Sequence, residues 1–266
     1  MRGRLVVCPT PIGNLEDVTL RVLRVLGAAD VIACEDTRHT RRLLDRHGIE
    51  GARLISNHEH NERRRAAELA GRVESGAVVA LVTDAGTPAV SDPGFALVRE
   101  CLARGLDVEV LPGPSAVTTA LVASGLPVDR WRFAGFLPRR AGELRAVLEQ
   151  GQETLIAFES PGRLPRTLAL LAEIDPERPV AVCRELTKVH EEVVRGAARE
   201  VAARFAQGAR GEIVVVVGPR ADEEAADAAG ARDAVEALVE AGARRRAAAR
   251  VVSRLTGVPA NRLYGD

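Results

Sequence analysis

The sequence predicts an α/β protein of two α/β domains followed by a small helical appendix. Short, nearly continuous apolar runs alternate with amphipathic stretches over most of the chain, a pattern typical of sheets covered by helices. The chain has 266 residues and is 46% hydrophobic, which suits two compact cores better than one. Near the C-terminus the composition shifts toward Ala, Asp, Glu and Arg, which separates the appendix from both domains.

The first domain is predicted to span residues 1–124. Its apolar runs predict strands over Leu5–Cys8, Val31–Cys34, Leu54–Ser56, Val78–Thr83 and Val108–Leu111. Helical periodicity predicts helices over Val18–Leu26, Thr40–His47, Asn61–Ser75, Phe95–Arg104 and Ser115–Ala123. Because the strands are apolar throughout rather than alternating, we expect a mostly parallel sheet with helices on both faces.

The second domain is predicted to span residues 125–219, after a boundary at Gly125–Asp129. Strands are expected over Trp131–Leu137, Thr154–Phe158, Val180–Arg184, Glu191–Arg195 and Glu212–Val217. Helices are expected over Glu143–Glu149, Leu164–Ile174 and Ala198–Phe205. With fewer helices per strand than the first domain, this half predicts a mixed sheet.

The appendix is predicted to span residues 220–266. Arg220–Gly230 is typical of a linker or a weak helix, and helices are expected over Asp233–Ala241, Arg246–Leu255 and Pro259–Tyr264. Both a helix-turn-helix and a plain helical hairpin that closes a dimer fit this spacing. The appendix carries a group of basic residues: Arg244, Arg245, Arg246, Arg250, Arg254 and Arg262. This local charge favours a phosphate-bearing partner.

Composition excludes several classes of protein. The formal net charge is zero and aromatics are 3%, which argues against a protein that coats nucleic acid indiscriminately or stacks bases on aromatic platforms. The cysteines Cys8, Cys34, Cys101 and Cys183 lie in apolar segments without paired spacing, so buried free thiols are expected. The segment His58–His60 lacks an evident third ligand, so no metal site is expected. Apolar runs are too short for a membrane span, and the expected location is the cytoplasm.

Two loops follow predicted strands and contain the small residues that close ligand contact requires. Thr83–Gly94 combines turn formers with two carboxylates, and Leu111–Ala116 repeats the pattern with two prolines and a glycine. Either loop alone could be an ordinary strand-to-helix connection. Because the two loops belong to one predicted sheet, together they indicate one small-molecule site.

The loop after the first strand constrains the ligand. Cys8–Leu15 replaces the Gly-x-Gly-x-x-Gly turn of dinucleotide-binding folds, and the chain has no Walker phosphate loop. NAD and ATP are therefore disfavoured. A nucleoside-like ligand without a phosphate fits better, and S-adenosylmethionine is the commonest ligand of that kind.

Seven motifs in order resemble one family. They are Thr10–Asp17, Cys34–Arg38, Asp84–Gly94, Pro112–Ala116, Phe158–Arg163, Arg184–Lys188 and Gly211–Glu212. Together with the terminal Asn261–Tyr264 they resemble the ribosomal RNA small-subunit methyltransferase I family, a branch of the tetrapyrrole-methylase superfamily. The resemblance covers essentially the whole chain.

The resemblance implies a homodimer with S-adenosylmethionine in a cleft between the two domains. It also implies methyl transfer to the ribose 2′-oxygen of a cytidine in 16S ribosomal RNA, as naked RNA or in the assembled small subunit. Carried over by position, the cofactor-binding residues are Pro11, Asp84, Ala85, Gly86, Thr87, Val90, Ser115, Ala116, Phe158 and Glu212. The porphyrin enzymes of the superfamily carry Gly-x-Gly-Pro-Gly-Asp in the first loop. Its absence here argues against a tetrapyrrole substrate.

Methyl transfer to a ribose hydroxyl requires alignment of three atoms in a water-poor cleft, and a positioned base assists it. The candidate catalytic residues are Lys188, Asp36, Glu35, Glu159 and also Glu185. Lys188 is the only lysine of the chain, and it could be a neutral base, a phosphate contact, an orienting group for a carboxylate or a solvated side chain. For the two acids before Thr37, capping of the following helix is the structural alternative.

Arginine clusters offer backbone contacts to RNA. Besides the appendix, the clusters are Arg38, Arg41, Arg42 and Arg46, then Arg63, Arg64 and Arg65, then Arg139, Arg140 and Arg145. Two other functions remain open from the sequence. One is C-methylation of a tetrapyrrole, and the other is a non-catalytic RNA-binding assembly factor.

Overall fold

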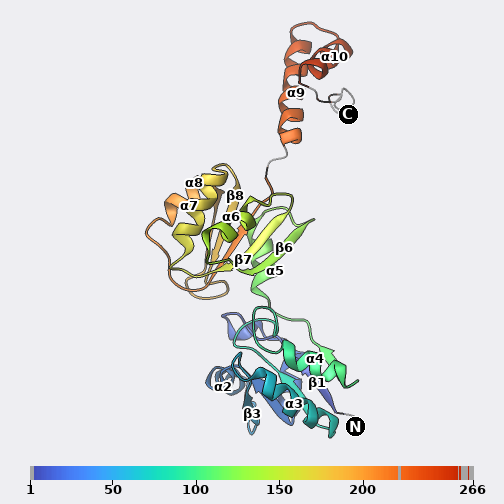
Figure 1. The fold of residues 1–266 in the computed structure, drawn as a ribbon, viewed down its shortest axis with the longest axis vertical. Coiled ribbons are helices and arrows are strands. Elements are labelled where there is room, and N and C mark those ends of the chain that lie inside the picture. The colour runs from blue at the N-terminus through green and yellow to red at the C-terminus, as the bar shows by residue number, and fades with distance from the viewer. Residues whose placement is uncertain (1–2, 221–222, 257, 259–262, 264–266) are drawn as a thin grey trace. The chain divides into compact units, whose positions relative to one another are not determined.

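The computed structural model describes residues 3–220, 223–256, 258 and 263, with the backbone alone over 223–229. The chain divides into two compact units, Met1–Gly218 and Pro219–Asp266. The larger unit contains two five-stranded sheets, and the described residues of the smaller unit form two helices (Figure 1). The predicted α/β class is confirmed.

The first sheet is parallel throughout. Its strands are β1 (Arg4–Val7), β2 (Val31–Cys34), β3 (Leu54–Ser56), β4 (Val78–Leu81) and β5 (Asp107–Val110), in the order β3-β2-β4-β1-β5. The central strands β1, β2 and β4 are almost wholly buried, as expected for apolar strands between two helical layers. The predicted parallel sheet is confirmed.

Helices cover both faces of this sheet. On one face lie α1 (Leu20–Ala28) and α2 (Thr37–Arg46), and on the other lie α3 (Glu62–Glu74) and α4 (Phe95–Ala103). A short 3-10 helix over Leu15–Asp17 precedes α1. The hydroxyl of Thr19 accepts a hydrogen bond from Val22 N, and this cap starts α1 two residues later than the apolar pattern predicts.

The second sheet is mixed, as predicted. Its strands are β6 (Trp131–Phe136), β7 (Thr154–Glu159), β8 (Pro179–Arg184), β9 (Glu192–Ala197) and β10 (Ile213–Val217), in the order β6-β7-β10-β8-β9. Only β6 and β7 pair in parallel. One face is covered by α6 (Ala141–Glu149), α7 (Leu164–Ile174) and α8 (Ala198–Arg204).

The opposite face of the second sheet is covered by α5 (Ala116–Ser124). Its buried Val117, Ala120 and Leu121 pack with residues of β7, β8 and β10. We expect this helix in the first domain from its position in the chain, yet it packs on the second sheet. The helix is apolar on nearly all sides, so its sequence pattern does not indicate which sheet it covers.

In the smaller unit the structure describes the helices α9 (Glu223–Glu240) and α10 (Arg245–Thr256). They pack through a small apolar core that includes Ala231, Val235, Ala248 and Val252. The helix α9 includes most of the segment predicted as a linker or weak helix. The predicted helix over Pro259–Tyr264 lies almost entirely outside the described residues.

A buried arginine ties β8 to the rest of the second domain. Arg178 is 1% exposed and donates hydrogen bonds to the carbonyls of Gly218 (2.8 Å), Leu148 (2.9 Å) and Gln150 (2.8 Å). Hydrogen bonds from a charged donor are stronger than neutral ones, and these three join the ends of α6 and β10. The other end of β10 reaches the site described below.

We expect Arg178→Met to lower the free energy of unfolding by about 2–4 kcal/mol, because three carbonyls, two of them on the buried residues Leu148 and Gly218, lose their donor. Urea denaturation followed by circular dichroism measures the change. The control is Arg166→Met on the exposed face of α7, for which a change below about 0.5 kcal/mol is expected. Equal stability of R178M and R166M would contradict the role assigned to Arg178.

Candidate active site

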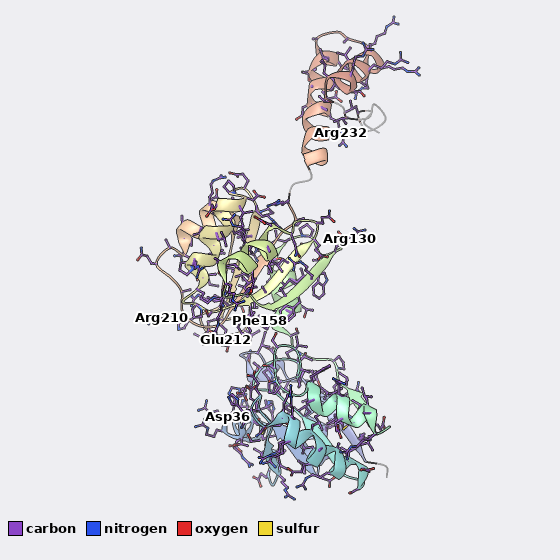
Figure 2. The ribbon with its side chains drawn as sticks, viewed as in Figure 1. Asp36, Arg130, Phe158, Arg210, Glu212 and Arg232 are labelled. Atoms are coloured by element: carbon purple, nitrogen blue, oxygen red, sulfur yellow. The ribbon has the colours of Figure 1, made fainter. Side chains whose placement is uncertain are left out.

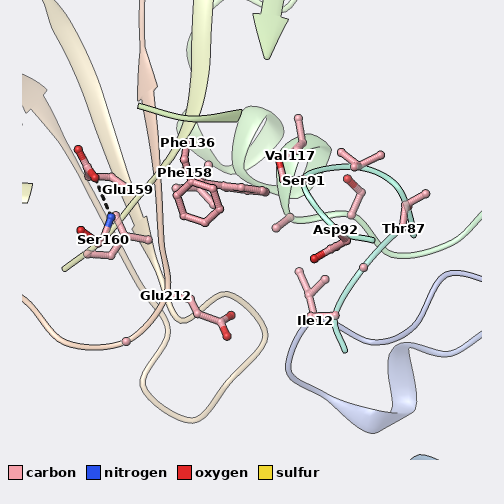
Figure 3. Close-up of a pocket in the computed structure, with 18 of the residues that line it drawn as sticks. Ile12, Thr87, Ser91, Asp92, Val117, Phe136, Phe158, Glu159, Ser160 and Glu212 are labelled. Atoms are coloured by element: carbon pink, nitrogen blue, oxygen red, sulfur yellow. Dashed lines mark hydrogen bonds between the residues drawn. The ribbon is translucent and has the colours of Figure 1, made fainter. Parts of the chain in front are cut away.

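A cavity of about 390 Å³ lies between the carboxyl ends of β1, β4 and β5 and the facing end of the second sheet. Its volume is in the range of small-molecule sites. Figure 3 shows Ile12, Thr87 and Asp92 on one side, and Phe158 and Glu212 on the other. Figure 2 shows Phe158 and Glu212 at the end of the second sheet that faces the first sheet.

Hydrogen bonds join the loops that follow three neighbouring strands. Thr10 and Gly86 exchange two backbone hydrogen bonds, each 2.9 Å long, and the Thr10 hydroxyl donates to Thr83 O at 2.9 Å. The hydroxyl of Thr87 donates to Pro114 O at 3.2 Å. Because these contacts connect the loops after β1, β4 and β5, that wall of the cavity is preorganised.

The turn that carries Asp92 is held in an uncommon backbone conformation. Ala89 and Ser91 have φ values of 69° and 63°, in the left-handed region that residues with a side chain rarely adopt. Gly94 has φ of 127°, and a Cβ there would lie 2.9 Å from a methyl group of Leu81. Gly94 N also donates to Glu62 Oε2 at 2.8 Å. These constraints fix the direction in which Asp92 leaves the turn.

Two phenylalanines form the apolar part of the opposite wall. The rings of Phe136 and Phe158 meet edge to face with 5.4 Å between their centroids. A register shift between Phe133 and Phe136, with Gly135 at φ 64°, redirects the end of β6. Such a wall offers a flat apolar surface to a planar ring.

The cavity is acidic. Asp92, Glu159 and Glu212 line it, and the described lining includes no Lys, Arg or His. Burial raises the pKa of Asp92 to about 7, and the nearby charges of Glu35, Asp84 and Glu212 contribute in the same direction. This lining favours a cationic ligand and disfavours a polyphosphate.

Most of the predicted cofactor-binding residues line this cavity. They are Ala85, Gly86, Thr87, Val90, Ser115, Ala116, Phe158 and Glu212. Pro11 and Asp84 are adjacent in sequence to lining residues but do not line the cavity themselves. The Asp84 carboxylate instead accepts a hydrogen bond from Asp36 N at 3.1 Å.

Lys188 does not line the cavity. Its ammonium lies 2.9 Å from Glu185 Oε1 and 3.0 Å from Glu212 Oε2. Burial opposes the charge, but hydrogen bonds to the two carboxylates outweigh it and raise the pKa of Lys188. The side chain is therefore a cation that orients Glu212. Glu185 also accepts a hydrogen bond from Glu212 N at 2.8 Å, which completes the network.

The two acids after β2 have different environments. Asp36 accepts a hydrogen bond from Arg38 N at 2.8 Å and caps α2, and its hydrogen bonds with Arg38 lower the pKa of its carboxyl. Glu35 does not cap the helix, because its Oε2 accepts a hydrogen bond from the Thr83 hydroxyl at 3.2 Å. Burial and then the charge of Asp84 raise the pKa of Glu35.

Glu159 is held by its neighbours although it lines the cavity. Its side chain is fully buried, its Oε2 accepts from the Thr167 hydroxyl at 2.6 Å, and its Oε1 accepts from Ser160 N at 2.8 Å. Arg163 lies 3.4 Å from the same carboxylate. The carboxylate thus fixes the end of β7, next to Phe158.

Sequence reasoning did not single out Asp92, although it lies in the Thr83–Gly94 loop that indicated a ligand site. The signal was its position in that loop, and only the fold brings it near Glu35 and Glu212.

The four cysteines are buried free thiols, as predicted. Across the described residues no cluster of His, Cys, Asp and Glu has the arrangement of a metal site. No helix in the described part of the chain combines the length and apolar character of a membrane span.

Comparison with known proteins gives consistent results. Residues 4–202 match the family model of the tetrapyrrole (corrin/porphyrin) methylases. A protein of Mesorhizobium japonicum named ribosomal RNA small subunit methyltransferase I is 49% identical, over 83% of this chain and 78% of its own length. A protein of the same name from a Hydrogenobaculum species is 44% identical, over 80% of this chain and 95% of its own length.

Solved structures share the fold. Uroporphyrin-III-C-methyltransferase from Thermus thermophilus is 25% identical with a TM-score of 0.55, over 82% of this chain and 94% of its own. A second structure of uroporphyrin-III C-methyltransferase from this organism is complexed with S-adenyl homocysteine, and it is 24% identical with the same TM-score over 81% of this chain and 97% of its own. The chain therefore belongs to the tetrapyrrole methylase family, and to the group in it that carries the name ribosomal RNA small subunit methyltransferase I.

Proposed function

We propose that this protein transfers a methyl group from S-adenosylmethionine to the ribose 2′-oxygen of a cytidine in small-subunit ribosomal RNA. The observation that carries the proposal is the acidic cavity with an aromatic wall, in a chain 49% identical to a named ribosomal RNA methyltransferase. The substrate implies that the reaction takes place in the cytoplasm.

The residues of the cavity fit this cofactor. Its sulfonium and ammonium groups are cations that suit Asp92 and Glu212, and its adenine is a planar ring that suits the wall of Phe136 and Phe158. Backbone amides at the start of α5 offer further donors without phosphate-binding glycines. When bound, the cofactor supplies a methyl group already activated by positive sulfur.

The chain's own residues then position and desolvate the reaction. The tied loops at Thr10, Gly86 and Thr87 form a rigid wall, and rigidity keeps the acceptor oxygen in line with the methyl group. The apolar wall excludes water from the same region. Asp92 is the lining carboxylate whose pKa of about 7 suits proton transfer near neutral pH.

Two other functions are disfavoured. A tetrapyrrole substrate is disfavoured because relatives at 44–49% identity are named for ribosomal RNA instead. A non-catalytic assembly factor would have no need for a preorganised cavity with strained turns at Ala89 and Ser91.

The direct test uses small subunits that lack the modification. The protein is incubated with them and with S-adenosylmethionine labelled in the methyl group, and the labelled nucleotide is mapped by nuclease digestion and mass spectrometry. We expect 2′-O-methylcytidine at one position. Label on a base carbon or nitrogen, or no label, would reject the proposal. Naked 16S ribosomal RNA in a parallel reaction identifies the preferred form of the substrate.

Ala116→Leu is expected to weaken S-adenosylmethionine binding by about 10-fold or more, because the larger side chain fills part of the cavity. Isothermal titration calorimetry measures the Kd. Thr118→Leu is the matched control, since Thr118 is exposed on the same helix and does not line the cavity. Equal affinities of A116L and T118L would place the cofactor elsewhere.

The proposal includes a homodimer, which exposed apolar residues on α4 support. Phe95 and Leu102 are seven residues apart, lie on one face of the helix, and are 59% and 60% exposed. Substitution of both by Glu is expected to give a monomer in sedimentation velocity at micromolar concentration. Leu20→Glu on α1 removes a side chain of similar exposure, 77%, and is expected to leave the dimer intact. A dimer that survives F95E/L102E would exclude this face.

We also propose that the smaller unit binds the RNA backbone. Arg246, Arg250 and Arg254 follow one another at four-residue spacing on α10, are exposed, and have no ion-pair partner among the described residues. Arg245, by contrast, pairs with Glu236 at 2.6 Å. A row of unpaired cations along one helix suits a row of phosphates.

Replacing these three arginines by Gln is expected to weaken RNA binding and to reduce the slope of log K against log salt by about 2–3 units. Filter binding over a range of salt concentrations measures the slope, and the Kd for S-adenosylmethionine is expected to stay unchanged. The charge-matched control replaces the exposed Arg24, Arg99 and Arg166 of the larger unit. Equal slopes for the two triple variants would contradict a specific role of α10.

A further inference from the structure

The acidic side of the cavity contains a hydrogen-bonded chain that leads away from Asp92. The Thr83 hydroxyl donates to Glu35 Oε2 at 3.2 Å, and it is also close enough to the Asp92 carboxyl to stabilise the ionised form of that group. Thr83 is 1% exposed, so this hydroxyl is shielded from bulk water. Asp92 lines the cavity, whereas Glu35 is half-buried outside it.

The chemistry of this arrangement follows from proton counting. A hydroxyl carries one proton, so Thr83 can donate a hydrogen bond to only one of the two carboxyl groups at a time. From the other carboxyl group it can only accept one. When Asp92 holds a proton, it donates to Thr83 and Thr83 donates to Glu35. When Asp92 is ionised, the hydroxyl turns to donate to it. Rotation of one hydroxyl therefore connects the two protonation states.

We propose that Thr83 and Glu35 form a proton path that takes the proton of the substrate hydroxyl from Asp92 out of the cavity. This inference rests on the proposed function, and it assigns Asp92 as the proton acceptor. Thr83 and Glu35 are positioning residues because they act through Asp92. Lys188 has no part in the path, since its cation is committed to Glu185 and Glu212.

The step is balanced in atoms and charge. A lone pair of the ribose 2′-oxygen forms the new bond to the methyl carbon, and the bond from carbon to sulfur breaks with its electron pair left on sulfur, which becomes neutral. The 2′-hydroxyl proton passes to the Asp92 carboxylate. From Asp92 the proton moves to Thr83 as the Thr83 proton moves to Glu35, and the half-buried Glu35 releases it to solvent.

Charged groups on several elements surround this path. Asp92 is near Glu35 after β2, Asp84 after β4 and Glu212 before β10, and all three charges raise its pKa together with burial. His58, after β3, is near Glu35 and lowers its pKa. The remaining charged neighbours are Glu62, which holds Gly94 N, and Lys188, which pairs with Glu212.

Two substitutions shift the Asp92 titration in opposite directions. Glu35→Gln removes a negative neighbour, so the pKa of Asp92 is expected to fall below its wild-type value of about 7. Thr83→Val removes the hydrogen bond that stabilises the carboxylate, so the pKa is expected to rise. If Thr83 and Glu35 served only in packing, the two substitutions would not shift the pKa of Asp92 in opposite directions.

The first measurement needs neither cofactor nor RNA. Carboxyl ¹³C resonances of aspartate-labelled apoprotein are titrated by NMR, with Asp92→Asn used to assign the Asp92 signal. T83S, which restores the hydroxyl, is expected to restore the wild-type titration. Asp45→Asn on the exposed face of α2 removes a distant carboxylate and is expected to cause no shift.

The second measurement is the single-turnover rate of methylation against pH at saturating S-adenosylmethionine. The wild-type rate is expected to rise with pH to a plateau. Because the cationic cofactor stabilises the Asp92 carboxylate, the inflection is expected below the value of about 7 in the apoprotein, lower still in E35Q and higher in T83V. On the plateau, D92N is expected to lose about 10²- to 10⁴-fold, and T83V about 10-fold.

The proton path would be overturned if the Asp92 titration did not shift in E35Q and T83V, or if D92N methylated RNA at the wild-type rate. Neither result would contradict ribose methylation by the wild-type protein. Absence of 2′-O-methylcytidine with the wild-type protein would reject the proposed function instead. The NMR titrations would then still decide whether the three side chains are coupled.

Discussion

The mutual hydrogen bonding of Thr10 and Gly86 is the contact on which the site depends. Neighbouring parallel strands β1 and β4 end at the same edge of the first sheet, and without this contact their loops would be free to separate. The two backbone bonds form an isolated antiparallel bridge, and together with the hydrogen bond from the Thr10 hydroxyl to Thr83 O they hold the two loops together beyond the parallel strands. The turn that carries Asp92 starts from this fixed point.

Electrostatics follow from that geometry. Because the loops are held together, the carboxyl groups of Glu35, Asp84 and Asp92 lie close to one another, and Glu212 approaches them from the second sheet. Burial and the mutual repulsion of these like charges raise the pKa of Asp92 to about 7. A cationic ligand relieves that repulsion, so the site is electrostatically suited to a sulfonium compound.

None of the described residues that line this cavity is basic. Lys188, which does not line the cavity itself, pairs with Glu185 and with the lining residue Glu212, and Arg38 pairs with Asp36 at the start of α2. The arginines Arg246, Arg250 and Arg254 of α10, which have no ion-pair partner in the part of the chain that the structure describes, belong to the smaller unit, outside the residues 4–202 that match the methylase family. The division is physically reasonable, because cations that bind phosphates inside the cavity would repel the methyl donor.

The sequence by itself determined the fold class, the parallel first sheet, the mixed second sheet and most of the cavity lining. Those features depend on local patterns: apolar runs, helical periodicity, and loops of small residues such as Ala85–Thr87 after buried strands. Helix boundaries were less predictable, because the caps at Thr19 and Asp36 depend on single hydrogen bonds.

Only the tertiary structure decided which sheet α5 covers and what the charged residues do. The apolar helix α5 has no polar face to indicate its partner, and it packs on the second sheet. Lys188 is held by Glu185 and Glu212, and Glu159 is held by Thr167. The contacts Lys188–Glu212 and Glu159–Thr167 join residues that are not neighbours in the chain, so no local sequence pattern predicts them. The pKa of Asp92 likewise depends on burial and on charges from three loops, which only folding brings together.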